Sequence, residues 1–426
     1  MIDIKILREN PGKMKENIIS RNLDPQKYNV DYILNLDIKR RELQKEVDNL
    51  RAQRNKISQE VGRAEGKEKE KLIQQAKEIK ESIEKLEKEF NMVEKELFSA
   101  LWQLPNFLSS KAPIGKDDSD NKEIKKWGNL PSFSFSPKDH LELGLINDLL
   151  DFERGGKVTG SNFYYLKNES VILEFALIQF VIDTLVSESF KLFITPDLAK
   201  MEVIEGIGFQ PRGPEAQIYK VEDTDLGLIA TAEITLGGYH KDEILDELDL
   251  PLKYLGFSHC FRTEAGAYGK YNRGLYRVHQ FSKVEIFIIC KPEDSEDMHE
   301  YILSLEEKIF QKLEIPYRVL DICSGDLGAP AARKFDIEAW MPGRGEYGEV
   351  TSCSNCTDYQ ARRLNIRFRR VTGELDYAHT LNGTAIAISR ALIAIFENYQ
   401  QEDGRIIVPK VLQPYTLGIK ELTPKR

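Results

Sequence analysis

The sequence predicts an α+β protein in which an antiparallel α-helical coiled-coil hairpin precedes a domain built on an antiparallel sheet flanked by helices. Two observations lead to this fold class. Apolar residues within the first hundred positions repeat at heptad spacing in two consecutive runs, which is typical of two paired helices. Farther along, strand-like segments mostly follow one another through hairpins, with single helices between them, which suits an antiparallel sheet.

Length and composition exclude several classes of protein. With 426 residues the chain can form two or three domains with a sizeable core. Its formal net charge of −9 argues against a general basic coat for nucleic acid, so any RNA contact must be local. No apolar run could span a bilayer, the N-terminus lacks a signal-peptide profile, and the five cysteines suit a reducing compartment. We therefore expect a cytoplasmic protein that does not contact membranes.

The helical hairpin is predicted over residues 28–104. The apolar positions of its first helix are Leu36, Leu43, Val47, Leu50, Ile57 and Val61, with Arg40 and Arg54 at the two irregular positions. Those of the second helix, which follows Gly62 and Gly66, are Leu72, Ala76, Ile79, Ile83, Leu86, Phe90, Val93 and Leu97. A short link makes the two helices antiparallel. At about 35 residues per helix and about 1.5 Å per residue, the hairpin would be about 50 Å long.

The charges of this hairpin allow two interpretations. Sixteen Lys and Arg balance sixteen Asp and Glu over residues 28–104, so the hairpin is neutral. In its distal half, however, basic residues with little acid between them gather at Arg51, Arg54, Lys56 and Arg63. The hairpin could be a dimerisation or spacer element, or an arm that lies along an RNA helix and recognises backbone and shape.

Residues 105–137 are polar and contain proline, and we interpret them as a linker to a domain over residues 138–426. In this domain the pattern predicts, in order, helix 171–186, strands 218–221 and 228–233, a hairpin over 261–285, helix 296–313, and strands 317–323 and 335–341. Neither a Rossmann nor a P-loop signature is present.

The predicted hairpin at 261–285 carries the strongest chemical pattern. Arg262 and Glu264 are two residues apart, so on an extended strand they would project to the same face. The guanidinium can hold a phosphate or carboxylate, while the carboxylate can hold a metal or an amine. A loop with Ala265, Gly266, Ala267, Gly269 and Arg273 follows, and we expect it to fold over a substrate. The alternative is an ordinary surface hairpin with a weak ion pair.

Three segments resemble the signature motifs of class II aminoacyl-tRNA synthetases. The stretch FRTEAG followed by GLYRVHQFSKVE is similar to motif 2 in its seryl-tRNA synthetase form. The stretch LNGTAIAISRALIAIFENYQQEDGRIIVP resembles motif 3, a strand followed by a helix that begins near Arg390. SFKLFITPDLAK, around Pro196, resembles motif 1, through which class II enzymes form homodimers. The resemblance covers nearly the whole chain, whereas the class I tetrapeptides HIGH and KMSKS are absent.

This resemblance implies a class II synthetase catalytic domain over residues 138–426 and an N-terminal tRNA-binding domain over residues 1–104, whose hairpin grips the long variable arm of a tRNA. The implied activity is ATP-dependent attachment of L-serine to tRNA(Ser) through seryl adenylate, with tRNA(Sec) as a second candidate acceptor. An aminoacyl:carrier-protein ligase is one alternative, although such relatives lack the long hairpin. An inactive synthetase-like binding protein is another, although it would be expected to lose Arg262, Glu264, Glu349 or Arg390.

The resemblance also implies the site residues. The catalytic residues would be Arg262, Glu264 and Arg390. The ATP-binding residues would be Arg262, Thr263, Glu264, Val278, Phe281, Glu349, Val350, Thr351, Ser352 and Arg390, with adenine between Phe281 and Arg390. The serine-binding residues would be Thr231, Ala232, Glu233, Arg262, Glu285, Asn382 and Thr384. Arg51, Arg54, Lys56 and Arg63 are the candidate tRNA contacts.

Particular roles follow for the serine-binding residues. Thr231 and Glu233 are expected on one strand face, where Glu233 takes the α-ammonium of the amino acid. Glu285 would accept a hydrogen bond from the substrate hydroxyl, and Thr384 and Asn382 would complete the pocket. A site built to bind a hydroxyl rejects analogues that lack one, because its own buried polar groups would stay unpaired.

Metal chemistry is expected at one place. Glu349, a glutamate expected just before a strand, and Ser352 match the family's Mg²⁺ positions beside the triphosphate, and Mg²⁺ prefers hard oxygen ligands. Cys353 and Cys356 form a CxxC motif, but a structural zinc site needs four ligands and no second pair exists. We expect these cysteines to be buried in a strand and turn, without zinc or redox function.

Overall fold

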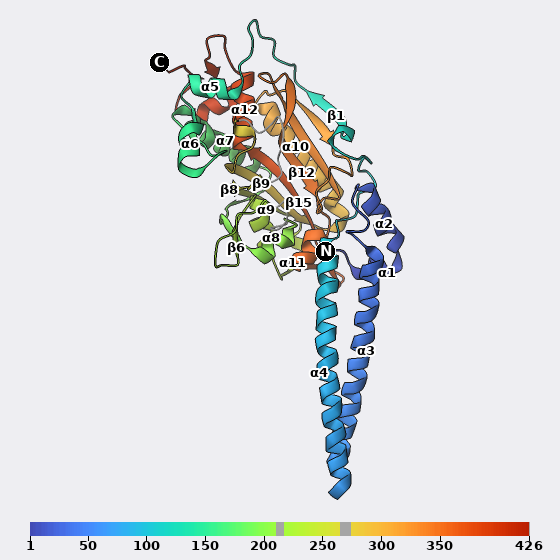
Figure 1. Ribbon diagram of the computed structural model, residues 1–426. Helices are drawn as coiled ribbons and strands as arrows, with labels where there is room; N and C mark the ends of the chain where they lie inside the picture. Colours follow the sequence, from blue (N-terminus) through green and yellow to red (C-terminus); the bar gives the residue numbers. More distant parts are fainter. Residues whose placement is uncertain (210–216, 265–273, 426) are drawn as a thin grey trace. The chain divides into compact units, whose positions relative to one another are not determined.

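The chain divides into two units, Met1–Phe107 and Leu108–Arg426. The computed structural model in Figure 1 describes residues 1–209, 217–264 and 274–425. The loop residues Ala265, Gly266, Ala267, Gly269 and Arg273, which we expect to cover a substrate, lie outside the described residues.

The first unit is entirely helical, with α1 (Ile4–Glu9), α2 (Pro11–Ser20), α3 (Val30–Val61) and α4 (Gly66–Gln103). Helix α3 begins where the Asn29 side chain accepts a hydrogen bond from the backbone N–H of Tyr32, because this caps an otherwise unpaired donor. Only residues 62–65 separate α3 from α4, and the two helices lie side by side in Figure 1. The predicted antiparallel hairpin is confirmed.

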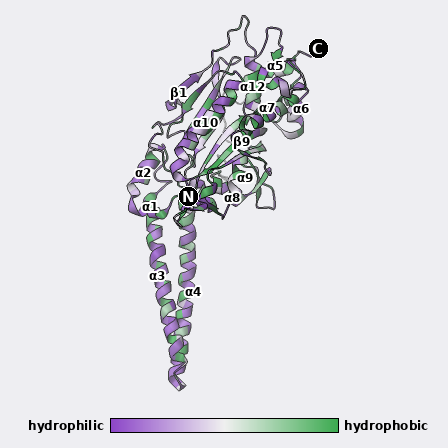
Figure 2. Cartoon of the chain, turned by 180° about the vertical axis from the view of Figure 1, so that it is seen from behind, coloured by the Kyte–Doolittle hydropathy of each residue, from purple (hydrophilic) through white to green (hydrophobic). Residues whose placement is uncertain are grey.

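Packing along the hairpin is uneven. Near its base Leu43 and Val47 of α3, and Val93 and Leu97 of α4, are buried. Toward the tip the predicted apolar positions Leu50, Ile57, Val61, Leu72, Ala76 and Ile79 are only half-buried. Figure 2 accordingly shows both helices as mostly hydrophilic, with hydrophobic patches between.

The irregular heptad position at Arg40 has a structural reason. Asp37, one turn earlier, is completely buried and lies 2.7 Å from Arg8 of α1 and 3.1 Å from Arg41. The Arg40 guanidinium lies 3.5 Å from the same carboxylate and 3.9 Å from Glu94 of α4. These ion pairs fasten α1 to the base of the hairpin and replace an apolar contact in its seam.

The second unit is built on an eight-stranded sheet in the order β1-β10-β11-β12-β15-β9-β8-β4. Its strands are β1 (Lys122–Trp127), β10 (Tyr317–Asp321), β11 (Arg333–Met341), β12 (Glu346–Asn355), β15 (His379–Ala387), β9 (Gln280–Cys290), β8 (Leu252–Phe261) and β4 (Lys191–Ile194). Neighbouring strands are antiparallel except β4 and β8, which are parallel. Strand β1 lies within the segment that we interpret as a linker, and it pairs with β10 at the edge of the sheet.

Helices flank this sheet as predicted. The longest are α7 (Glu169–Val186), α10 (Ser295–Lys312) and α12 (Ile388–Asn398), which bury their apolar side chains in the main core. A second core lies around α8 (Met201–Ile207), α9 (Ala232–Gly238) and α11 (Tyr359–Leu364). The remaining helices are α5 (His140–Ile146) and α6 (Phe152–Thr159). Within the described part of the chain, no helix is both long enough and apolar enough to cross a membrane.

Small sheets complete the unit. They pair β2 (Leu150–Asp151) with β3 (Tyr165–Leu166), β5 (Leu198–Lys200) with β6 (Leu226–Leu228), and β16 (Ile406–Ile407) with β17 (Glu421–Leu422). A three-stranded sheet joins β14 (Leu375–Tyr377), β13 (Arg367–Arg369) and β7 (Ile244–Asp246).

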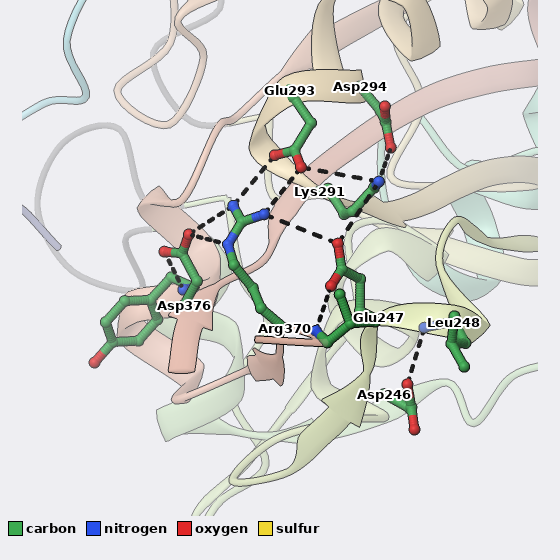
Figure 3. A network of polar contacts seen from close by, with 10 residues as sticks. Asp246, Glu247, Leu248, Lys291, Glu293, Asp294, Arg370 and Asp376 are labelled. Carbon is green, nitrogen blue, oxygen red and sulfur yellow. Dashed lines mark hydrogen bonds and ion pairs between the residues drawn. The ribbon is translucent and has the colours of Figure 1, made fainter. Parts of the chain in front are cut away.

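A network of charges ties the three-stranded sheet to the end of β9 (Figure 3). Arg370, directly after β13, lies 3.0 Å from Glu293 and 2.9 Å from Asp376. Its hydrogen bonds lower the pKa of Glu293 to about 2. Lys291 lies between Glu247, Glu293 and Asp294 at 3.7–3.8 Å. The side chains of this network are only partly buried, so we expect each ion pair to contribute little to stability.

Two strand predictions in this unit are wrong. Residues 218–221 form only an isolated bridge, between Lys220 and Gly227, and the strand predicted at 228–233 ends at Leu228. Thr231 instead caps α9, because its hydroxyl accepts a hydrogen bond from the backbone N–H of Glu233 at 3.2 Å. Thr231 and Glu233 therefore do not share a strand face.

The extended strand predicted through Arg262 and Glu264 is also wrong, since β8 ends at Phe261. Backbone pairing there passes to another segment: Thr263 N–H donates to the Gln217 carbonyl at 3.1 Å, and Glu264 N–H donates to the Gln217 side chain at 3.1 Å. Glu264 consequently adopts a left-handed backbone with φ of 49°. Glu349, expected before a strand, lies inside β12, where it pairs with Glu338 beside a β-bulge.

Candidate active site

A cavity of about 350 Å³ lies where β9, β12 and β15 meet the beginnings of α9 and α12. Its lining residues are Phe209, Thr231, Glu233, Arg262, Glu264, Tyr276, Arg277, Val278, Phe281, Lys283, Glu285, Lys334, Glu349, Val350, Thr351, Ser352, Asn382, Thr384, Ala387, Ser389 and Arg390. Charged and hydroxyl side chains dominate this list, so the cavity is suited to a polar, charged ligand.

The strand order explains why these side chains meet. Strand β15 lies between β12 and β9, and its register places Thr384 opposite Glu285. On the other side of β15, Asn382 pairs with Ser354 of β12. Helix α12 begins at Ile388, directly after β15, so its first turn brings Arg390 to the cavity. Segments more than a hundred residues apart in the chain therefore supply one wall.

Two buried groups on β9 form a polar floor. The Glu285 carboxylate contacts the ammonium of Lys283, and the Thr384 hydroxyl lies 3.5 Å from both groups. Burial raises the pKa of Glu285, while Lys283 and Arg262 oppose that rise. This cluster offers a ligand hydroxyl two possible partners, the Glu285 carboxylate and the Thr384 hydroxyl.

Glu233, in the first turn of α9, is the second carboxylate of the cavity. Its Oε1 accepts hydrogen bonds from the side-chain amide of Gln360 at 2.7 Å and from that of Asn382 at 2.9 Å. Burial, followed by the charge of Glu285, raises the pKa of Glu233 to about 7. The group is thus poised between its neutral and ionised forms near neutral pH, and an incoming cation would favour the ionised form.

Arg262 and Arg390 bring two guanidinium groups to the cavity. Arg262 lies over the ring of Phe281, 5.3 Å from its centroid, and its Nε donates to the Ala230 carbonyl at 3.3 Å. Arg390 lies over the ring of Tyr276, at 4.9 Å. Each guanidinium is thereby held on an aromatic face and can still present N–H groups to an anion.

Two carboxylates of the cavity form ion pairs with arginines. Glu349 lies 3.1 Å from Arg390, and Glu264 lies 3.1 Å from Arg277. Although burial alone would raise the pKa of Glu349, Arg390 and Lys334 lower it to about 2, so this carboxylate is ionised at neutral pH. Within the described ranges, no group of three or more His, Cys, Asp and Glu side chains could hold a metal ion by itself.

Most of the predicted site residues line this cavity. Of the predicted set, the exceptions are Thr263, which follows β8, and Ala232, which is buried in the second core. Sequence reasoning missed Phe209, Tyr276, Arg277, Lys283, Lys334, Ala387 and Ser389 as lining residues. For Lys283, its alternation with Phe281 and Glu285 along β9 was a usable signal, whereas Phe209 and Lys334 reach the cavity only through tertiary packing.

The remaining predictions concern groups outside the cavity. Cys353 in β12 and Cys356 directly after it are buried and form no disulfide, so the prediction of buried residues in a strand and turn is confirmed. In the N-terminal unit, Arg51 lies 2.8 Å from Glu87 of α4, and Arg54 donates to Asn55 at 3.3 Å. Lys56 and Arg63 are exposed. Arg51 also lies 3.8 Å from Asp48, one turn earlier in α3, so it is paired with acids of both helices.

Comparison with known proteins covers both units. The model of the seryl-tRNA synthetase N-terminal domain matches residues 1–108, and that of the tRNA synthetase class II core domain (G, H, P, S and T) matches residues 219–399. A serine–tRNA ligase from Dictyoglomus turgidum is 83% identical over 426 residues, which is 100% of both chains. One from Treponema denticola is 53% identical over 97% of this chain and 98% of its own.

A solved structure agrees with these matches. The crystal structure of seryl-tRNA synthetase from Pyrococcus horikoshii complexed with ATP superposes with a TM-score of 0.91 and 47% identity, covering 100% of both chains. Identity of this extent, over full length in sequence and in structure, leaves one assignment: the chain belongs to the seryl-tRNA synthetase family.

Proposed function

We propose that this chain attaches L-serine to tRNA(Ser) in two ATP-dependent steps through seryl adenylate. The observation that carries the proposal is a single cavity that combines two buried carboxylates and a hydroxyl with two guanidinium groups. The first set suits a small zwitterion with a hydroxyl side chain, and the second suits a triphosphate. Family membership supports the same reaction, and tRNA(Sec) is a second candidate acceptor.

For serine, we assign the ammonium to Glu233 and the side-chain hydroxyl to Glu285 and Thr384. Asn382 holds Glu233 at 2.9 Å and closes the wall between the two carboxylates. Alanine would offer no hydroxyl to Glu285 and Thr384, so the hydrogen bonds that serine makes to these buried groups would be lost. Arg262 is the group that can hold the serine carboxylate.

For ATP, we assign the α-phosphate to Arg262 and the terminal phosphates to Arg390. A serine carboxylate oxygen attacks the α-phosphorus in line and bonds to it, the bond from that phosphorus to the α,β-bridging oxygen breaks, and pyrophosphate leaves seryl adenylate behind. Positioning and charge stabilisation account for this step, because no covalent intermediate with the protein is needed. The adenine would lie near Phe281 and Arg390, and Tyr276 adds a second aromatic face.

Glu349 and Ser352 would hold a Mg²⁺ ion. They fit it because both present hard oxygen atoms to the cavity from one strand, and because Glu349 is ionised. Mg²⁺ keeps several waters and bridges phosphates, so two protein ligands suffice. When bound, it would neutralise charge on the leaving pyrophosphate.

In the second step, a ribose hydroxyl at the 3′ end of the tRNA attacks the seryl carbonyl carbon and AMP leaves. We assign tRNA docking to the N-terminal domain over residues 1–104, through the hairpin residues Arg51, Arg54, Lys56 and Arg63. The match of residues 1–108 to the seryl-tRNA synthetase N-terminal domain supports this assignment. These basic residues would contact phosphates more than bases.

We also propose a homodimer formed through β4 and α7, the elements of motif 1. Strand β4 ends the order of the large sheet and leaves Ile194 86% exposed, while Phe175 of α7 is 66% exposed. An apolar sheet edge of this kind is a liability unless another surface covers it. Sedimentation at the 49.0 kDa of one chain would contradict the dimer. A cytoplasmic location is proposed as well, supported by five cysteines that form no disulfide.

The decisive experiment is serine-dependent exchange between ATP and pyrophosphate, followed by charging of total tRNA. A synthetase gives both activities. Exchange with transfer to a carrier protein and no tRNA charging would indicate the ligase alternative. A folded chain without exchange would be the inactive binding protein, and the proposal would fail.

A further inference from the structure

We propose that Gln360 of α11, hydrogen-bonded to Thr380 of β15, is a positioning residue for serine binding, because it fixes the Glu233 carboxylate against the substrate ammonium. The inference rests on the proposed function, in which Glu233 receives that ammonium. Neither Gln360 nor Thr380 lines the cavity, so their effect on a ligand must pass through Glu233.

Both polar atoms of the Gln360 amide are hydrogen-bonded. Its nitrogen donates to Glu233 Oε1 at 2.7 Å and to the Ile207 carbonyl at 3.0 Å. Its oxygen accepts from the Thr380 hydroxyl at 2.6 Å. Two donors and one acceptor are thus matched by two acceptors and one donor, all of them in the interior.

This pattern allows only one orientation of the amide. If the amide were rotated by 180°, its oxygen would face the Glu233 carboxylate and the Ile207 carbonyl, and its nitrogen would face the hydroxyl. The amide oxygen would then face two other oxygen atoms with no hydrogen between them. This arrangement loses two buried hydrogen bonds and brings like partial charges together. The Glu233 carboxylate and the Ile207 carbonyl, which can only accept, therefore select the orientation in which an N–H points at Glu233, and the Thr380 hydroxyl pairs the amide oxygen in that orientation.

The backbone around Gln360 is held as firmly as its side chain. Gln360 and Thr380 are completely buried. Helix α11 packs closely on α8, since a Cβ at Gly206 would lie 2.4 Å from Leu364. Arg363, on the next turn, donates to the Glu205 carbonyl at 2.9 Å. The amide donor is consequently fixed with respect to the second core.

Fixing one oxygen of Glu233 leaves the other for a ligand. Both amides, from Gln360 and Asn382, donate to Oε1, and among the described residues Oε2 accepts no side-chain hydrogen bond. The charged groups that face Glu233 are Glu285 and Lys283 of β9 and Arg262 after β8. Gln360 lowers the pKa of Glu233 against burial and Glu285, so it also favours the ionised form that an ammonium requires.

The test is the KM for serine, measured by pyrophosphate exchange from pH 6 to 9, with the KM for ATP as internal reference. Gln360→Met keeps the side-chain volume and removes the amide. We expect about a tenfold rise in serine KM, an unchanged ATP KM, and an upward shift of the pH at which serine KM begins to rise. An unchanged serine KM and pH profile, or equal rises for serine and ATP, would overturn the inference.

A matched pair at Thr380 keeps the test valid should Gln360→Met fail to fold. Thr380→Val removes the hydroxyl and is expected to raise serine KM, whereas Thr380→Ser retains it and should restore a value near that of the parent chain. Equal values for the two variants would overturn the inference. As a control for loss of a buried amide elsewhere, Gln400→Leu removes hydrogen bonds to Lys138 and should lower thermal stability without changing serine KM.

Failure of the proposed function would look different. If Glu233 does not bind the ammonium, Glu233→Gln leaves serine KM unchanged, and the proposed role of Glu233 fails whatever Gln360 does. If Glu233→Gln raises serine KM and Gln360→Met does not, only the positioning role of Gln360 fails.

Discussion

The Arg390 guanidinium lies 3.1 Å from the Glu349 carboxylate, so the first turn of α12 is paired across the cavity with strand β12. Each group is thereby kept ionised in a buried site, where an unpaired charge would pay a desolvation cost without compensation. A triphosphate would interact with the positive charge of Arg390, and the cation that accompanies it would interact with the negative charge of Glu349. The pair therefore occupies the expected phosphate site before ATP arrives.

Removing the arginines tests that assignment. Arg390→Ala and Arg262→Ala should each lower serine-dependent pyrophosphate exchange at least tenfold, about 1.4 kcal/mol of transition-state stabilisation, because each removes a phosphate-binding cation. Exchange rates at saturating substrates measure the effect, and circular dichroism verifies folding. Near-normal exchange by a folded Arg390→Ala chain would contradict the role of Arg390.

The hydroxyl pocket is tested at Thr384. Thr384→Val is nearly isosteric but lacks the hydroxyl beside Glu285, so serine KM should rise several-fold while ATP KM stays nearly constant. Thr384→Ser, which keeps the hydroxyl, is the matched control and should bind serine nearly as well as the parent chain. Equal losses for serine and ATP in Thr384→Val would mean that the pocket had collapsed.

Serine binding should depend on pH through Glu233. Its pKa of about 7 in the free protein means that the carboxylate is protonated below that pH, and a protonated carboxyl cannot pair with an ammonium. Serine KM should therefore rise as pH falls below about 7 and level off toward pH 8. ATP KM at fixed saturating serine provides the reference, and a flat serine profile between pH 6 and 8 would contradict the prediction.

The role of the hairpin can be separated from the chemistry by shortening it. Because Arg51 and Glu87 pair across the two antiparallel helices, Leu50 and Lys88 lie at a similar level and can be joined by a short Gly-Ser linker. This removes the distal half but leaves the base, where Arg8 and Asp37 fasten α1. The variant should form seryl adenylate normally and lose most tRNA charging. Charging at the full-length rate would make the hairpin a spacer.

Charge reversal refines that test. Arg54→Glu, Lys56→Glu and Arg63→Glu should weaken tRNA charging in a salt-dependent way, because phosphate contacts depend on counterion release. Arg51→Glu should have an additional effect on stability, since it faces Glu87 at 2.8 Å. Lys420→Glu, an exposed reversal outside the hairpin, is the control, and an equal effect there would indicate nonspecific electrostatics.

Close packing beneath the site should make Gly383 intolerant of substitution. A Cβ at this position of β15 would lie 2.3 Å from Ile302 and 2.7 Å from Glu306, both on α10. Gly383→Ala should therefore destabilise the chain by about 1–3 kcal/mol in urea unfolding. Gly156→Ala in α6, where a Cβ meets nothing within 4 Å, is the control and should be neutral or stabilising. Equal stability of the two variants would refute the packing argument.

Local patterns in the sequence were sufficient for the parts whose physics is local. Heptad spacing determined the hairpin, because helix pairing follows from which residues share a stripe. Alternation and the motif residues located the hairpin of β8 and β9, the turn from β15 into α12, and most of the cavity lining. Strand predictions failed where a side chain offered the backbone another partner, as Thr231 and Gln217 do.

Only the tertiary structure decided which groups pair and how they are charged. The sequence indicated Glu233, Glu349 and Arg51 as site residues, but not their partners. In the structure Gln360 holds Glu233, Arg390 pairs with Glu349, and Glu87 pairs with Arg51. Strand β1 joins the sheet from a polar segment because β10 offers an open edge, which no local pattern records. Burial and charge depend on residues distant in the chain, and these set the opposite pKa shifts of Glu233 and Glu349.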